Sequence, residues 1–141
     1  MKYFLAACCA MVAMLSASTY VNAGEKMKVV YHVSEADRVA FALNNMKNHI
    51  KGVGGPEKIE LVLVAHGPAL KAFHELAAVP KISKRVTELQ SIGVKFEACG
   101  NTMRAQAVQL DDLLPKFTRR DEGGVVRIAE LQFKGYAYIR P

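Results

Sequence analysis

The order of apolar segments along the chain predicts an α/β fold, in which helices pack on a mainly parallel β-sheet. Short runs rich in β-branched residues alternate with segments whose apolar residues recur at helical spacing. The run at 59–65 is almost continuously apolar, which is typical of a strand covered on both faces of a parallel sheet. We therefore expect strands and helices joined by right-handed crossovers.

The first half of the chain supplies two of the predicted strands. Residues 27–33 form a β-branched run, and Ser34 with Asp37 three positions later is typical of a helix start. Apolar residues then recur at helical spacing over 39–52, which predicts a long helix. A glycine-rich loop follows and leads into the buried strand 59–65.

The second half repeats this alternation. The third strand, 94–99, should place Val94, Phe96 and Ala98 on one face and Lys95, Glu97 and Cys99 on the other. The remaining predictions are short helices at 70–76 and 82–93, a helix from near Thr102, a weak strand at 117–119, a helix at about 124–134 and a last strand at 136–139, which could lie at a sheet edge.

The N-terminus has the organisation of an export signal. Lys2 precedes an apolar run at 3–15, and Val21-Asn22-Ala23 has the small-x-small pattern of a cleavage site. The apolar run is shorter than the roughly 20 residues that a membrane span needs. We expect cleavage after Ala23, a periplasmic protein and one domain over 24–141, without a membrane anchor.

The charge pattern argues against nucleic acid as a partner. The formal net charge is +6, but the basic residues are scattered and no run of like charge reaches five residues. Aromatic side chains do not interleave with them, so they are interpreted as solvated faces of the domain.

Cys99 is the candidate reactive residue. The chain has three cysteines, and Cys8 and Cys9 would leave with the signal. Cys99 lies where the third strand meets a helix, and the unpaired N–H groups of a helix start favour thiolate over thiol. The amides of Gly100, Asn101 and Thr102 should hold a sulfur substrate at this turn. Four roles remain open for the thiol: core filler, intermolecular disulfide, metal ligand or reactive carrier.

Two histidines are predicted to join Cys99 at one rim, because ligands bind beyond the carboxyl ends of parallel strands. His32, with Tyr31 and Ser34, ends the first strand, and His66 ends the second. A histidine near the thiol can lower its pKa by stabilising the thiolate. Structural interpretations also stand: His32 as a half-buried strand residue, and His66 as a group that satisfies its own turn. His49 and His74 receive no role.

Four motifs in order carry a resemblance to a known family. They are Val-Ala-His-Gly-Pro-Ala-Leu at 64–70, Phe-Glu-Ala-Cys-Gly-Asn-Thr-Met at 96–103, Leu-Leu-Pro at 113–115 and the ending at 135–141. Together they resemble the small single-domain branch of the DsrE/DsrF-like family. The resemblance implies a three-layer α/β/α sandwich with a five-stranded, mainly parallel sheet, and assembly into trimers or hexamers. It also implies that Cys99 matches the cysteine that accepts sulfane sulfur as a persulfide in sulfur-relay members.

These observations leave three functional hypotheses. The first is a periplasmic sulfane sulfur carrier or transferase that acts through Cys99, with His66 as its helper, His32 in the substrate site, no cofactor and a protein as sulfur donor or acceptor. The second is a binding module for a soft metal or small ligand, since imidazole and thiolate together suit zinc or copper, although no close-spaced ligand pair supports it. The third is an oligomeric protein with a purely structural cysteine.

Overall fold

The sheet is built from five parallel strands in the order β4-β3-β2-β1-β5. A computed structural model describes residues 25–141, so the predicted signal at 1–23 lies outside the described part of the chain. β5 lies at one edge, as its sequence suggested. The strands are β1 (Met27–Val33), β2 (Ile59–Ala65), β3 (Lys95–Cys99), β4 (Phe117–Arg120) and β5 (Ala137–Ile139).

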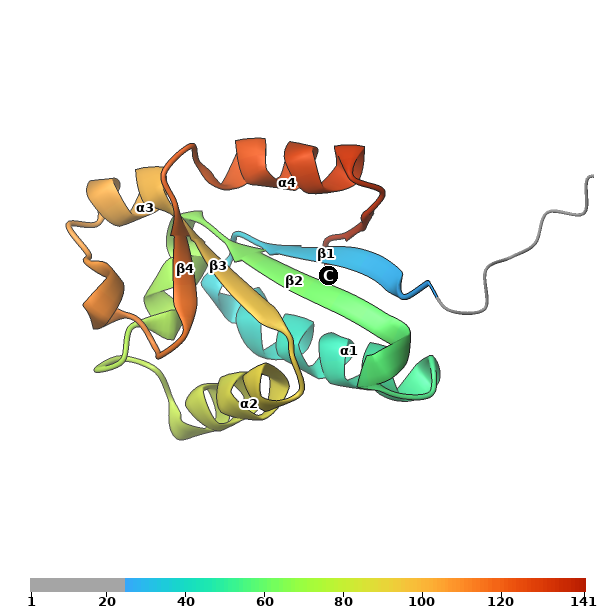
Figure 1. The fold of residues 1–141 in the computed structure, drawn as a ribbon. Coiled ribbons are helices and arrows are strands. Elements are labelled where there is room, and N and C mark those ends of the chain that lie inside the picture. The colour runs from blue at the N-terminus through green and yellow to red at the C-terminus, as the bar shows by residue number, and fades with distance from the viewer. Residues whose placement is uncertain (1–24) are drawn as a thin grey trace, which may run out of the picture.

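Helices cover both faces of this sheet and give the expected three layers (Figure 1). The helices at 39–52 and 80–91 lie on one face, the helix at 124–133 lies on the other, and the short helix at 100–105 sits at the carboxyl ends of the strands. In chain order these are α1 (Val39–Gly52), α2 (Pro80–Ser91), α3 (Gly100–Ala105) and α4 (Gly124–Phe133). Short 3-10 helices complete the connections at η1 (Ala36–Arg38), η2 (Pro56–Lys58), η3 (Gly67–Phe73) and η4 (Leu110–Asp112).

The parallel register brings the candidate residues to the same edge. Ala65 of β2 pairs with Ala98 of β3, so His66 and Cys99 follow on neighbouring strands. His32 of β1 pairs with Val64 of β2, one step before that edge. Because side chains alternate between the faces of a strand, His32, His66 and Cys99 all project toward the face that α4 covers.

Apolar packing is divided unequally between the two faces. The larger cluster joins the sheet to α1, α2 and η3, and it includes three phenylalanine rings. Phe73 and Phe117 have ring centroids 5.1 Å apart, and Phe96 lies 5.4 Å from Phe117. The smaller cluster lies beneath α4 and consists of the buried residues Val30, Val62, Val64, Ile128 and Leu131, with Tyr136 packed against them. The predicted alternation of β3 is confirmed, since Val94, Phe96 and Ala98 belong to the larger cluster.

The predicted helix at 70–76 is wrong in type and extent. The segment is the 3-10 helix η3, which starts at Gly67 and ends at Phe73. A tight backbone turn begins it, with Gly67 at φ +57° and Pro68 at the first positions of the helix. Leu76 lies beyond its end and is fully exposed. The apolar spacing of Leu70 and Phe73 therefore reports their burial rather than an α-helical period.

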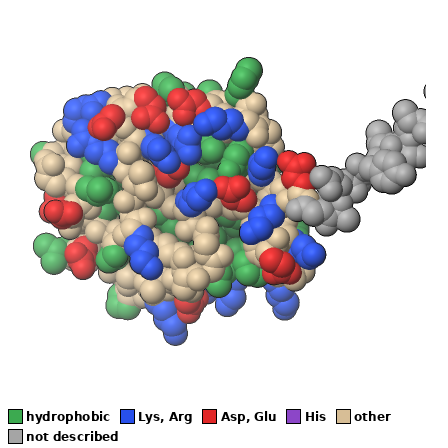
Figure 2. Space-filling model, in the orientation of Figure 1, with side chains coloured by type: hydrophobic (Ala, Val, Ile, Leu, Met, Phe, Trp, Pro, Cys, Tyr) green, Lys and Arg blue, Asp and Glu red, His purple; other side chains and the backbone are tan. Residues whose placement is uncertain are grey.

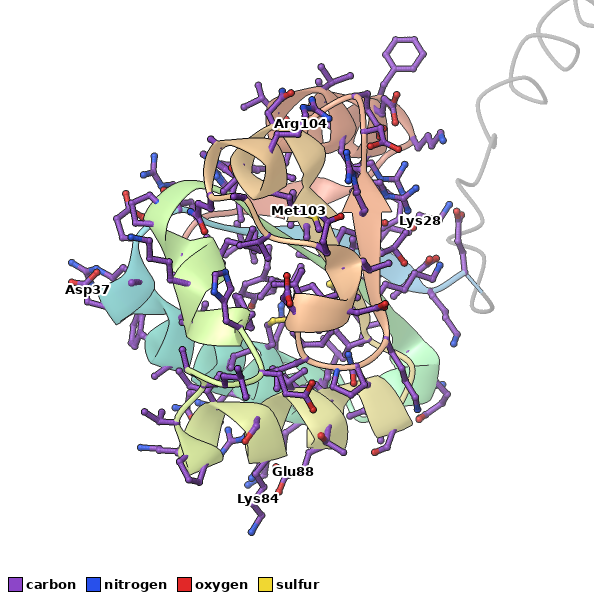
Figure 3. All side chains as sticks on the ribbon, turned by 90° about the vertical axis from the view of Figure 1, so that its left-hand side faces the viewer. Lys28, Asp37, Lys84, Glu88, Met103 and Arg104 are labelled. Atoms are coloured by element: carbon purple, nitrogen blue, oxygen red, sulfur yellow. The ribbon has the colours of Figure 1, made fainter. Side chains whose placement is uncertain are left out.

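Two helix starts also differ from the prediction. Ser34 does not cap α1, because its hydroxyl donates to the carboxylate of Glu35 at 2.7 Å and η1 precedes the helix. α3 begins at Gly100, two residues before Thr102, because the chain turns into the helix directly after Cys99. Figure 3 views this end of the molecule, with Met103 and Arg104 labelled on α3; Met103 is fully buried and Arg104 is exposed.

Basic and acidic side chains are interspersed over the face of the molecule that Figure 2 displays. Over residues 25–141, none of the helices is both long enough and apolar enough to cross a bilayer.

Candidate functional site

Cys99 is the last residue of β3 and the residue that precedes α3. Its side chain is largely covered, with 6% of the residue exposed. The turn that follows requires glycine, because a Cβ at Gly100 would lie 2.7 Å from the carbonyl oxygen of Arg120. The close passage of the end of β4 over Gly100 therefore fixes where the thiol lies.

Hydrogen bonds to the Cys99 sulfur decide its ionisation. Burial raises the pKa of the thiol, but a hydrogen bond from the Thr102 side chain and others from the backbone N–H groups of Gly124, Thr102 and Asn101 lower it. The net pKa lies below the ordinary value of a cysteine, in the direction that the sequence predicted. The groups that favour the charged form of the sulfur are thus three backbone N–H groups and one hydroxyl, from the starts of α3 and α4.

The Thr102 hydroxyl is oriented by its other hydrogen bond. Its oxygen accepts from the backbone N–H of Gly67 at 2.9 Å, and the carbonyl oxygen of Gly67 accepts from Gln106 Nε2 at 2.9 Å. A hydroxyl has a single hydrogen to donate. Since Gly67 supplies the hydrogen of the first bond, the hydrogen of Thr102 is free to point at Cys99.

The start of α4 closes over the thiol from the other side. Gly123 has φ +103°, which favours glycine, and Gly124 then packs directly on the site. A Cβ at Gly124 would lie 3.1 Å from Cys99 Cβ and 3.4 Å from His66 Cβ. Gly124 therefore serves two purposes: it lets its own N–H approach the sulfur, and it lets Cys99 and His66 lie side by side.

A buried carboxylate anchors α4 in this position. Glu97 is 1% exposed and lies two residues before Cys99 on the same face of β3. Arg127 of α4 donates to it through Nε at 2.7 Å and Nη2 at 3.0 Å, and Arg120 of β4 donates as well. Burial alone raises the pKa of Glu97, but the hydrogen bonds from Arg127 and Arg120 hold it below its usual value. The carboxylate is therefore charged at neutral pH.

The two histidines are joined to each other and to β5. His32 Nε2 lies 2.5 Å from His66 Nε2, and His32 Nδ1 lies 2.6 Å from the Tyr138 hydroxyl. Burial, the neighbouring His66 and the Arg140 guanidinium lower the pKa of His32 to about 4, against a smaller opposite effect of Glu35. Burial and Arg140 likewise lower the pKa of His66. Both imidazoles are neutral at neutral pH.

This neutrality changes the role expected of His66. The sequence suggested that a histidine would stabilise the thiolate, whereas the groups that lower the thiol pKa are Thr102 and the three amides. A neutral imidazole carries one N–H donor and one acceptor nitrogen. His66 is therefore equipped to move a proton beside Cys99 rather than to supply a positive charge.

The metal hypothesis has no ligand set in the described part of the chain. Residues 25–141 contain no group of three or more His, Cys, Asp or Glu side chains placed to hold a metal ion. The 2.5 Å separation of His32 Nε2 and His66 Nε2 is that of a hydrogen bond. Two imidazole nitrogens that each bind one zinc ion at about 2.0 Å stand farther apart than this.

Asn101 acts on the thiol through its backbone N–H, as the sequence indicated, and its side-chain oxygen accepts from Arg104. The two other residues that the sequence grouped with His32 lie on different sides of the sheet edge. Tyr31 is not part of the site, because it points to the opposite face, where its hydroxyl contacts His49 Nδ1 at 3.0 Å. Ser34 lies at the rim and accepts from Arg140 at 3.0 Å.

Sequence reasoning missed five contributors to the site. They are Gly124, Tyr138, Arg120, Arg127 and Arg140. All five come from the last part of the chain. The tertiary fold, and not proximity in the sequence, brings them to the earlier residues of the site. A usable signal was present for Arg120 and Arg127: the alternation of β3 placed Glu97 on the face of Cys99, and a buried carboxylate needs cationic partners.

Comparison with known proteins identifies the class of this protein. The family model described as the DsrE/DsrF-like family matches residues 26–141, so the chain belongs to that family. Among solved structures, it is similar to MTH1491, a protein of unknown function from Methanobacterium thermoautotrophicum, with 31% identity, a TM-score of 0.74 and coverage of 82% of this chain and all of that one. The comparison with curated proteins found no match.

A second solved structure supports the fold alone. The ychN protein from E. coli has 13% identity and a TM-score of 0.66, with 82% of this chain and 99% of that chain covered. The five-stranded parallel sheet with helices on both faces is thus the fold of this family. The family is generally linked to sulfur relay.

Proposed function

We propose that this protein is an exported carrier of sulfane sulfur, in which Cys99 holds the sulfur as a persulfide. The observation that carries the proposal is the position of Cys99 between the starts of α3 and α4, where a Cβ at Gly124 would lie 3.1 Å from Cys99 Cβ and where Thr102 and three backbone N–H groups lower the thiol pKa. Membership of a family linked to sulfur relay supports it. Persulfide transfer needs a thiolate as the attacking group, and this environment favours the thiolate.

The depth of Cys99 suits a carrier. With 6% of the residue exposed, the thiolate offers only a small accessible surface, which limits its loss to oxidation. Loading places a second sulfur about 2.0 Å beyond the first, which brings the transferable atom closer to the rim formed by His66 and the start of α4. The carrier would receive sulfur from one partner protein or small persulfide and pass it to another.

Mass spectrometry of residues 24–141 tests the proposal. After incubation with glutathione persulfide and removal of the excess, the intact protein should gain the mass of one sulfur atom and lose it on treatment with dithiothreitol. Cys99→Ser should gain nothing, and this control is clean because Cys99 is the only cysteine of that segment. A wild-type mass that stays unchanged would show that Cys99 is a structural residue.

We also propose that the protein works as a homo-oligomer, as a trimer or hexamer. β5 pairs on one side only, and α4 exposes an apolar stripe of Val125, Val126 and Phe133 beside it, with Phe133 97% exposed. Contact between chains would cover this stripe and the edge strand. Sedimentation equilibrium at micromolar concentration should give a multiple of the chain mass, and Phe133→Glu should lower it.

Export to the periplasm is the last part of the proposal. It rests on the signal organisation of residues 1–23, with cleavage after Ala23. Expression of the full chain in a Gram-negative host, followed by osmotic shock, should release a protein whose N-terminal sequence begins at Gly24. Recovery of the uncleaved chain from the cytoplasm would contradict it.

A further inference from the structure

Three side chains from three neighbouring strands form one continuous hydrogen-bonded chain that ends beside Cys99. Tyr138 of β5 contacts His32 of β1 at 2.6 Å, and His32 contacts His66, which follows β2, at 2.5 Å. His66 and Cys99 in turn both lie against Gly124. Tyr138 is 41% exposed, whereas His32 is 8% exposed and Cys99 is 6% exposed. The chain therefore leads from solvent to the covered thiol.

Only two arrangements of protons fit these contacts when both imidazoles are neutral. In the inward arrangement, the Tyr138 hydroxyl donates to His32 Nδ1, His32 Nε2–H donates to His66 Nε2, and His66 carries its proton on Nδ1. In the outward arrangement each bond is reversed, and His66 Nδ1 is left free to accept. Since each imidazole has one N–H, the tautomers of the two histidines are coupled to each other and to the orientation of the tyrosine hydroxyl.

The surroundings of His32 and His66 favour the neutral form of both imidazoles. The charged groups that act on the histidines are the Arg140 guanidinium, which lies near both rings, and the Glu35 carboxylate, to which Arg140 is bound. The planes of the two imidazole rings are nearly parallel, at 19° to each other with centroids 4.6 Å apart, so the two Nε2 atoms face each other close to the ring planes. A second proton on the Nε2 that accepts in this pair would place two N–H groups against each other at 2.5 Å, so a proton that enters one end of the neutral chain has to leave at the other.

We propose that Tyr138 and His32 form a proton relay that lets His66 protonate the thiolate released when Cys99 accepts sulfur. This inference rests on the proposed function and deepens it. Tyr138 and His32 are positioning residues in this scheme, because they act through His66.

The reaction with a persulfide donor balances as follows. The Cys99 thiolate attacks the outer sulfur of R–S–SH, the new S–S bond forms as the bond to R–S breaks, and R–S⁻ leaves. His66 Nδ1 gives its proton to R–S⁻, His66 Nε2 takes the proton of His32 Nε2, and His32 Nδ1 takes the proton of Tyr138. The Tyr138 oxygen is then reprotonated by solvent. No oxidant or reductant is consumed, because the sulfane sulfur keeps its oxidation state.

Two thiol reagents with different leaving groups test the relay independently of persulfide chemistry. Exchange of Cys99 with 2-hydroxyethyl disulfide releases a basic thiolate, whose departure is assisted by a proton, whereas methyl methanethiosulfonate releases an acidic sulfinate that needs none. In Tyr138→Phe the first reaction should slow about tenfold, a part of the roughly 10²–10⁴ that acid catalysis contributes, while the second should keep its rate.

Tyr31→Phe is the matched control. It removes the same hydroxyl from the opposite face of the sheet, where Tyr31 contacts His49, so both reactions should keep their wild-type rates. Nitrogen-15 NMR of labelled histidines gives a second readout: His32 and His66 should each show one tautomer in the wild type and in Tyr31→Phe, and tautomer mixtures in Tyr138→Phe.

The outcomes separate this inference from the proposed function. If Tyr138→Phe affects the two reagents equally, or affects neither, the relay is wrong even when the wild type loads sulfur from a persulfide. If the wild type fails to load sulfur but Tyr138→Phe slows only the exchange with the basic leaving group, the relay holds and the carrier function is wrong.

Discussion

The two faces of the sheet are built in different ways. The face under α1 and α2 buries a continuous apolar cluster that includes three phenylalanines. The face under α4 has only five buried apolar residues, and alongside them it holds a charged carboxylate, a histidine and the thiol. The face under α1 and α2 therefore supplies most of the free energy of folding. The face under α4 holds polar groups in space that apolar side chains would otherwise fill. The thiol and the larger apolar cluster thus lie on opposite sides of a single sheet.

Removal of an aromatic ring from the larger cluster should have the largest effect on stability. Phe73 is fully buried, and Phe73→Ala should lower the free energy of unfolding by about 3–5 kcal/mol through lost burial and the cavity that remains. Urea denaturation measures the loss. The pKa of Cys99, taken from the pH dependence of iodoacetamide alkylation of the folded protein, should stay at its wild-type value. A shifted thiol pKa would show that the two faces are coupled.

The buried Glu97 should come next, because it holds α4 to the sheet. Glu97→Ala leaves two guanidinium groups without their carboxylate, and we expect a loss of about 2–3 kcal/mol, below the 3–5 kcal/mol found for fully buried pairs since both arginines are partly exposed. The measurement is urea denaturation at pH 7. A loss well under 1 kcal/mol would mean that apolar contacts alone hold α4 in place.

The same residue predicts a pH dependence of stability. The pKa of folded Glu97 lies below its unfolded value of about 4.3, so its contribution is present above that pH and is lost as the pH falls through the folded pKa. Glu97→Gln should flatten the stability profile below about pH 4 relative to the wild type. Parallel profiles for the two proteins would contradict this.

Thr102 should affect the thiol far more than the fold. Thr102→Val removes the hydroxyl that donates to Cys99 and should raise the thiol pKa, since the thiolate loses a hydrogen bond that favours its charged form. Thr102→Ser keeps the hydroxyl and serves as the control. The pH profile of alkylation is the measurement, and equal profiles for the two variants would exclude the hydroxyl as a thiolate partner.

A pair of glycine substitutions should give the smallest effects and opposite signs. Gly124→Ala places a methyl group 3.1 Å from Cys99 Cβ, so the start of α4 has to shift, and we expect a loss of about 1 kcal/mol with a raised thiol pKa. Gly52→Ala, at the end of α1, meets nothing within 4 Å and should stabilise the protein by up to about 1 kcal/mol. Unfolding curves of both variants, with alkylation of the first, test the contrast.

The sequence predicted the larger face better than the smaller one. The strand and helix order, the buried β2 and the two faces of β3 all follow from hydrophobic periodicity, which reports apolar burial. The same reasoning brought His32, His66 and Cys99 to one edge of the sheet. The same reasoning wrongly predicted an α-helix at 70–76. Residues at i and i+3 are buried by a 3-10 helix as well as by an α-helix, so their spacing does not distinguish the two.

The partners of the thiol were harder to predict, because they depend on tertiary contacts. Tyr138 and His32 are 106 positions apart and meet only because β5 pairs with β1. Arg127 and Glu97 are 30 positions apart and meet only because α4 crosses that face of the sheet. Nothing in local periodicity indicates which strand lies next to β1. His66 lies beside Cys99 against Gly124, and its pKa is lowered by burial and by Arg140, a residue of the last segment.

The position of β5 in the chain has a consequence for how the site comes into being. The ribosome makes Cys99 well before Gly124, Tyr138 and Arg140, so an unfinished chain carries the cysteine without the Gly124 amide beside it, and without the Tyr138 hydroxyl and the Arg140 guanidinium that act on the two histidines. The lowered pKa of the thiol therefore depends in part on α4, which is made only after the chain has passed well beyond Cys99. The complete environment of the thiol belongs to the finished protein, and a chain cut before Gly124 would keep only the contributions of Thr102 and Asn101.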